Sequence, residues 1–156
     1  SMLRGHPHHD VGHNPAGGLV MFALMLLILL IGLTGSDLVQ VVDWKQQKIV
    51  KEIKTGKGAH NFRPLGDKRH IFLTNRVDST ISIIDMEKLE KVADIKGLPS
   101  GPDCMDVTAD GKELWVTFRF AKKVGIIDIA SRKLVTTIPV GKSPHGIFFH
   151  SNAAWE

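Results

Sequence analysis

The strongest constraint in this sequence is an internal repeat of 42 to 43 residues in the part that follows residue 36. A hydrophobic residue followed by aspartate ends three similar segments, at Val42-Asp43, Ile84-Asp85 and Ile127-Asp128. A short turn sequence recurs with the same period, at Gly58-Ala59-His60, Gly101-Pro102-Asp103 and Ser143-Pro144-His145. A unit of about 40 to 45 residues is typical of a four-stranded propeller blade. Residues 37–156 are therefore predicted to form such blades.

The local pattern inside each repeat predicts β-strands. Polar and apolar residues alternate over Thr80–Asp85, as a half-buried strand requires. Further strands are predicted at Glu113–Phe118, Lys133–Val140 and Ile147–His150. No segment after residue 37 has a helical period. The fold class is therefore all-β, a partial β-propeller of about three four-stranded blades behind one N-terminal transmembrane helix.

Three blades do not close a ring, because closed propellers need at least about four. The open ends would expose sheet faces and strand edges, which favours association. Three interpretations follow: a fragment of a longer protein, a homodimer that completes a ring of about six blades, or an open stack. The expected partner of the propeller is another protein or a second copy of the chain.

The N-terminal part predicts a membrane segment. Leu19–Leu33 is a run of fifteen residues without a polar side chain. About twenty such residues in a helix cross a hydrocarbon core of about 30 Å, so residues 16–35 are predicted to span a bilayer and to contact lipid. Residues 1–15 are then a juxtamembrane tail. The alternative is a cleaved signal peptide with Arg4 in its basic region, and either interpretation exports the blades.

Several function classes find no support in the sequence. Basic and acidic residues are interleaved after residue 37, which is typical of a solvated surface, so no nucleic-acid partner is expected. Cys104 is the only cysteine, which rules out an intramolecular disulfide and a C-x-x-C-H haem attachment. Walker, G-x-S-x-G and H-E-x-x-H motifs are absent, so no catalytic residue is nominated and the balance is against an enzyme. The tail histidines are not expected to form a functional metal site, and no metal ligand is nominated.

The repeats resemble the YVTN family of propeller proteins and, more loosely, the haem-binding propeller of cytochrome-type nitrite reductases. The matching segments are Phe72 to Arg76, Ile83 to Asp85, Asp110 to Lys112, Leu114 to Thr117 and Ile138 to Ile147. Proteins of the YVTN family are usually exported bacterial proteins with diverse roles. Residues 12–18, GHNPAGG, and the apolar run after them resemble one helix of bacterial inner-membrane cytochromes b, although the run contains no histidine.

Five residues at equivalent repeat positions are candidates for a binding site. His60, Asp103 and His145 begin the first strand of three successive repeats, near the central axis of a propeller. Arg76 and Arg119 form a second equivalent pair. The resemblance to the nitrite reductases implies that His60, His145, Arg76 and Arg119 hold a haem-type cofactor. The alternative is that these side chains satisfy turn amides. Asp106, on a strand, is expected to face solvent, and Trp115 is expected to lie in the core.

Together these observations predict a membrane-anchored, exported propeller that acts as a binding platform for a protein partner or a ligand in a redox assembly. The expected location is the bacterial inner membrane with the propeller in the periplasm, although Lys45, Lys48 and Lys51 argue against this orientation under the positive-inside rule. One alternative is an oxidoreductase-like propeller with a haem cofactor. The other is a non-functional fusion of two gene remnants.

Overall fold

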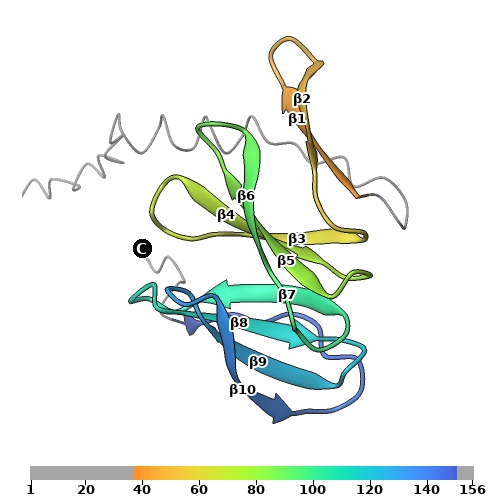
Figure 1. The fold of residues 1–156 in the computed structure, drawn as a ribbon, viewed down its shortest axis with the longest axis vertical. Coiled ribbons are helices and arrows are strands. Elements are labelled where there is room, and N and C mark those ends of the chain that lie inside the picture. Colours follow the sequence, from red (N-terminus) through yellow and green to blue (C-terminus); the bar gives the residue numbers. More distant parts are fainter. Residues whose placement is uncertain (1–36, 151–156) are drawn as a thin grey trace, which may run out of the picture.

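The computed structural model describes residues 37–150 (Figure 1). The predicted juxtamembrane tail, the segment 16–35 and the cytochrome b-like stretch lie outside the described residues. Within residues 37–150, no helix reaches the length and apolarity that crossing a membrane requires.

The described part is all-β, as the repeat predicts. Its strands are β1 (Leu38–Asp43), β2 (Lys48–Lys54), β3 (Ala59–Pro64), β4 (His70–Asn75), β5 (Thr80–Asp85), β6 (Glu90–Ile95), β7 (Pro102–Val107), β8 (Glu113–Phe118), β9 (Lys123–Asp128) and β10 (Lys133–Pro139). They form three antiparallel sheets: the hairpin β1-β2 and two four-stranded meanders, β3-β4-β5-β6 and β7-β8-β9-β10. The two meanders are the complete blades that the 43-residue period predicts.

The blades stack face to face, with β1-β2 against one side of the first blade (Figure 1). Phe72 and Ile83 of the first blade pack against Leu114, Val116 and other residues of the second to form one core. Successive residues of a strand point to opposite faces, so Ile71 and Leu73 face the other way and pack against Val39 and Val41 of β1. Each sheet is thus stabilised by a neighbour that covers its apolar face.

Tight turns close the hairpins with aspartates that end the strands. The Asp43 carboxylate accepts from the backbone amides of Lys45 and Gln46, and the Asp85 carboxylate accepts from those of Glu87 and Lys88. Asp128 accepts from the amide of Ser131 in the same way. The recurrent aspartates that revealed the period therefore hold turns.

Two expectations are wrong, one about the last repeat and one about the second blade. Ile147–His150 is not a strand, because a strand needs a ladder partner and none of the described strands pairs with this segment. The segment instead lies along the second blade, where the Phe149 amide donates to Asp106 Oδ2 at 2.6 Å. Trp115 is half-buried on the outer face of that blade rather than in its core, with its ring edge-on to Phe149 at a centroid distance of 5.5 Å.

Candidate ligand-binding site

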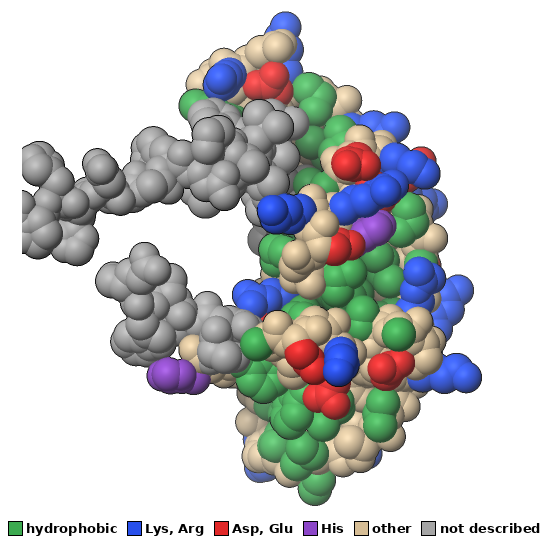
Figure 2. All heavy atoms as spheres, turned by 90° about the vertical axis from the view of Figure 1, so that its left-hand side faces the viewer, with side chains coloured by type: hydrophobic (Ala, Val, Ile, Leu, Met, Phe, Trp, Pro, Cys, Tyr) green, Lys and Arg blue, Asp and Glu red, His purple; other side chains and the backbone are tan. Residues whose placement is uncertain are grey.

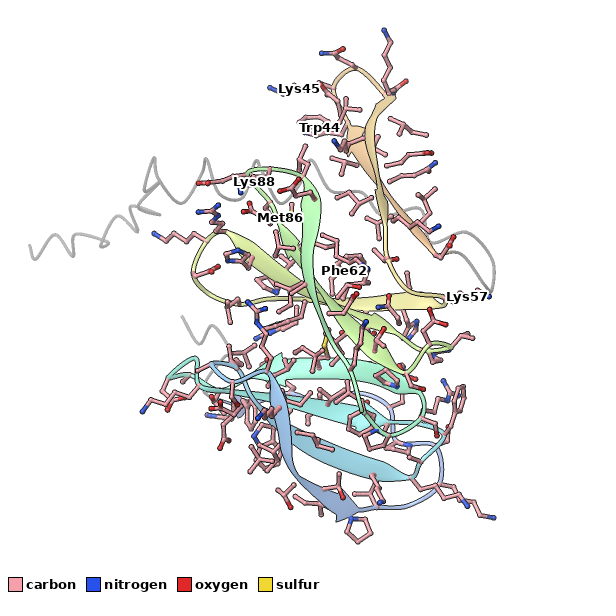
Figure 3. All side chains as sticks on the ribbon, viewed as in Figure 1. Trp44, Lys45, Lys57, Phe62, Met86 and Lys88 are labelled. Atoms are coloured by element: carbon pink, nitrogen blue, oxygen red, sulfur yellow. The ribbon has the colours of Figure 1, made fainter. Side chains whose placement is uncertain are left out.

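The site begins with a β-bulge at the start of each inner strand. The β3-β4 register shifts between Ala59 and Phe62, and the β7-β8 register shifts between Pro102 and Met105. A bulge leaves a residue out of the ladder and redirects its side chain. Here it redirects His60 in the first blade, and in the second it covers the pair Asp103 and Cys104 (Figure 3, where Lys57 marks this end of β3).

Threonines on the neighbouring strands satisfy the amides that the bulges release. The amide of Asn61 donates to Thr74 Oγ1, and the amide of Cys104 donates to Thr117 Oγ1, each at 3.0 Å. Thr74 Oγ1 also donates to the carbonyl of Asp103 at 2.9 Å, which joins the two blades. The bulged backbone is therefore held on both sides without an unpaired buried amide at these positions.

A second repeated device places the arginines. Gly58, Gly101 and Ser143 occupy equivalent positions, and all three have φ between 54° and 75°. Their left-handed conformation turns the chain into the inner strand. The amides of Arg76 and Arg119 donate to the carbonyls of Gly58 and Gly101 at 2.8 and 2.7 Å. Both arginine side chains consequently start from the same edge as the bulges.

Four of the five residues predicted from the repeat converge on the carboxylate of the fifth, Asp103. Its Oδ1 lies 2.7 Å from His60 Nε2 and 3.0 Å from His145 Nδ1. Its Oδ2 lies 3.2 Å from Arg76 Nη2 and 3.5 Å from Arg119 Nη1. The Arg76 guanidinium also contacts His60 Nε2. Sequence positions 43 and 42 residues apart thus meet at a single point.

The side chains of this site become more exposed from its centre outwards. The Asp103 side chain is fully buried, whereas the His145 side chain is 57% exposed. The two imidazoles lie 6.3 Å apart between ring centroids, on either side of the carboxylate. The site therefore has a buried anionic floor and an accessible histidine on its rim.

The surroundings of Asp103 and His60 lower the pKa values of both side chains. Burial by itself would raise the pKa of Asp103, but the Arg76 guanidinium and the His60 imidazole outweigh it and hold that pKa below its usual range. Burial and the Arg76 charge both lower the pKa of His60 from its ordinary value.

Cys104 belongs to the same site and was missed from the sequence. Its Sγ lies 3.5 Å from Asp103 Oδ1 and 3.5 Å from His145 Nδ1. Burial raises the pKa of the Cys104 thiol, so the thiol is not an activated nucleophile. We call His60, Arg76, Asp103, Cys104, Arg119 and His145 the inner-strand cluster. The adjacency of Cys104 to Asp103 was visible, but an unbroken strand would send adjacent side chains to opposite faces.

A second contact joins β3 and β7, three residues further along each strand than His60 and Asp103. Arg63 Nη2 lies 2.5 Å from Asp106 Oδ1, and Asp106 is 1% exposed, so the expectation that Asp106 faces solvent is wrong. Arg63, Asp106 and Phe149 are spaced by 43 residues, and the Phe149 amide binds the same carboxylate. Asp106 is therefore a structural link between successive repeats.

Known proteins resemble this chain in sequence and in architecture. A family model described as YNCE-like beta-propeller matches residues 20–154. Protein NirF of Stutzerimonas stutzeri is 36% identical over 73 residues, which are 47% of this chain and 18% of that protein. The hydrazine synthase structure of Kuenenia stuttgartiensis aligns with a TM-score of 0.58 and 29% identity, over 65% of this chain and 30% of its own.

A third protein matches in fold alone. The structure of the dihydro-heme d1 dehydrogenase NirN in complex with DHE aligns with a TM-score of 0.60 and 21% identity, over 72% of this chain and 25% of its own. The chain thus spans less than a third of the length of each of these three proteins.

Proposed function

The chain belongs to the YNCE-like β-propeller family, and on this premise we propose that it is a binding module whose ligand contacts the inner-strand cluster. One observation carries the proposal: side chains from two blades and from the start of a third meet at Asp103, and the rim residue His145 remains accessible. Convergent polar groups at one edge of a stacked scaffold are typical of a binding site.

The geometry favours binding over catalysis. A nucleophilic cysteine needs a histidine in which one imidazole nitrogen accepts the thiol proton. The other imidazole nitrogen is held by a group that orients the ring. Here the Cys104 thiol and the Asp103 carboxylate both approach Nδ1 of His145, at 3.5 and 3.0 Å. The carboxylate therefore cannot orient the ring while that nitrogen accepts the thiol proton.

The test uses two probes on the full chain in detergent, hemin and a series of divalent cations, with thermal unfolding as the readout. At least one probe should raise the midpoint, and the rise should vanish when His60 and His145 are both replaced by alanine. His70→Ala is the matched control, because His70 pairs with Asp67 at the opposite edge of the blade. If no probe raises the unfolding temperature of the unaltered chain, the proposal is wrong.

A haem-type cofactor is the second candidate, supported by the exposed imidazole of His145, which shares the Asp103 carboxylate with Arg119. The Asp103 carboxylate lies in hydrogen-bond contact with both His60 and His145, so a macrocycle has no room between the two rings. A haem would therefore be held from outside the cluster, where His145 would supply an imidazole for the iron and Arg119 a positive charge for the haem carboxylates. A Soret band that persists in His60→Ala and disappears in His145→Ala would support this candidate.

We further propose that residues 16–35 anchor the module in the bacterial inner membrane with the blades in the periplasm; the alternative is export followed by signal cleavage. The length and apolarity of the segment support the anchor. Protease added to intact spheroplasts should degrade the blades and spare a cytoplasmic marker. Protected blades would place them on the cytoplasmic side.

A further inference from the structure

We propose that His60, Asp103, Cys104 and His145 bind a divalent transition-metal ion of the zinc class. This inference rests on the proposed function, because it names the ligand of the same cluster. Within the described residues these four side chains offer one donor atom each, and all four donors lie within 4.8 Å of one another. They come from the two bulges and from the turn that begins the third repeat.

The donor distances are close to those of a tetrahedral site. Zinc binds nitrogen at about 2.0 to 2.1 Å and sulfur at about 2.3 Å, so donors at the corners of a tetrahedron are about 3.3 to 3.8 Å apart. Cys104 Sγ is 3.5 Å from both His145 Nδ1 and Asp103 Oδ1. The imidazole nitrogens are 2.7 and 3.0 Å from Asp103 Oδ1. A bound metal ion would replace these hydrogen bonds. The donor atoms would have to move by several tenths of an ångström to about 1 Å.

The donor set selects the class of ion. Two imidazole nitrogens, one sulfur and one carboxylate oxygen suit zinc, cobalt or nickel. Magnesium and calcium prefer oxygen ligands, which this site offers only through Asp103. The cluster should therefore discriminate strongly against the two hard cations.

Asp103 is prepared as a ligand by the arginines. Its Oδ2 makes no hydrogen bond of good geometry but lies beside the Arg76 and Arg119 guanidiniums, which orient the carboxylate and leave Oδ1 facing the imidazoles. Such contacts outside the ligand shell fix ligand orientation. Arg76 also contacts His60 Nε2, so this guanidinium must leave that nitrogen when the metal binds. Arg76 and Arg119 are thus positioning residues.

The experiment is a Co²⁺ titration of the full chain in detergent, followed by absorption spectroscopy. The tail histidines His6, His8, His9 and His13 are replaced by asparagine in every sample, so that they cannot bind the probe. Tetrahedral cobalt with one thiolate should give intense d–d bands and a sulfur-to-cobalt charge-transfer band. Zinc should displace the cobalt, and a large excess of magnesium should not.

Variants separate the site from general binding. Cys104→Ser should abolish the charge-transfer band, and His145→Ala should weaken Co²⁺ binding at least about tenfold. His70→Ala should leave the charge-transfer band and the affinity for Co²⁺ unchanged. Circular dichroism checks that each variant is folded. A cobalt spectrum that survives Cys104→Ser would overturn the four-ligand site.

The outcome also distinguishes this inference from the proposal on which it rests. If hemin binds through His145 and Co²⁺ does not bind, the metal site is wrong and the binding module stands. If neither probe binds, both are wrong.

Discussion

Asp103 connects three repeats through a single side chain. Its carboxylate contacts residues from the first blade, from its own blade and from the turn that begins the next repeat. A buried carboxylate is costly unless it is paired, and here it meets two guanidiniums and two imidazoles. The same residue therefore contributes to stability and lies at the centre of the binding site.

Replacing Asp103 by asparagine should destabilise the protein by about 1 to 3 kcal/mol, because the arginines lose their counter-charge and the imidazoles a strong acceptor. The estimate is at the lower end for a buried ion pair, since the arginine side chains are partly exposed. Urea unfolding measures the change. Asp43→Asn is the control: its oxygen still accepts from the turn amides, and the change should stay within about 0.5 kcal/mol.

The Asp85–Arg69 pair should give stability a defined pH dependence. Hydrogen bonds from Arg69 lower the pKa of Asp85 from its ordinary 3.8 to about 2. Because the folded pKa lies below the unfolded one, the stabilisation is fully present above about pH 4 and is lost as the pH falls through about 2. The stability difference between the unaltered chain and Asp85→Asn should be constant from pH 7 to 5 and shrink from pH 4 to 2. A difference that stays constant down to pH 2.5 in urea unfolding would contradict this assignment.

At the residue scale, the repeat identified five of the six members of the inner-strand cluster. His60, Asp103 and His145 shared one repeat position and Arg76 and Arg119 another, and equivalent positions in stacked repeats lie side by side. Cys104 was missed because its place depends on a bulge, and the sequence pattern of an inner strand does not reveal one.

At the level of elements, each blade combines a left-handed turn, a bulge and an adjacent strand. Together these fix the site edge. In the first two repeats the turn residue is glycine, and in the third Ser143 adopts the same backbone conformation with φ of 54°. Ser143 Oγ accepts from Arg119 Nε at 2.9 Å, so its side chain is also used. The turn geometry persists although the residue changes.

Gly101 should be far less tolerant of substitution than Gly111, although their φ angles are 72° and 71°. A Cβ on Gly101 would lie 2.5 Å from the Phe120 ring, whereas a Cβ on Gly111 meets nothing within 4 Å. Gly111→Ala should cost about 1 kcal/mol for its backbone conformation. Gly101→Ala should cost about 1 to 3 kcal/mol more because of the clash.

Urea unfolding gives the loss of stability in each glycine variant. The difference between the two losses measures the cost of the clash, because the cost of the left-handed backbone conformation is common to both variants. Gly101→Ala should also weaken ligand binding, because the Gly101 carbonyl accepts from the Arg119 amide at 2.7 Å. Equal destabilisation by the two variants would show that the Phe120 contact relaxes freely.

The strands predicted at Thr80–Asp85 and Glu113–Phe118 have the observed bounds. Both are central strands, and each pairs with a neighbour on either side. Ile147–His150 is also rich in isoleucine and phenylalanine, which favour strands, but it forms no ladder. Local pattern establishes that a segment is suited to a strand, and pairing establishes that it is one.

At the scale of the whole molecule, the outer face of the second blade has no blade against it within the described residues. Hydrophobic side chains are exposed at this end of the molecule (Figure 2). The β9-β10 register places Val124, Ile126 and Ile138 on one face, and Ile138 is 42% exposed. The segment that contains Phe149 covers only the part of this face near Trp115. In a propeller, the next blade covers such a face.

The chain should therefore associate through this face, and the detergent-corrected particle should contain at least two copies in analytical ultracentrifugation. Lysine at both Ile126 and Ile138 should shift the particle towards a single copy, because burying a charge on this face is costly without a counter-charge. Val92→Lys, on the outermost strand of the first blade, is the control and should leave the mass unchanged. Both variants should keep the β-sheet signal in circular dichroism. A single-copy particle for the unaltered chain at all concentrations would mean that the exposed face is not a self-association surface, and the interpretation as part of a longer propeller would then be favoured.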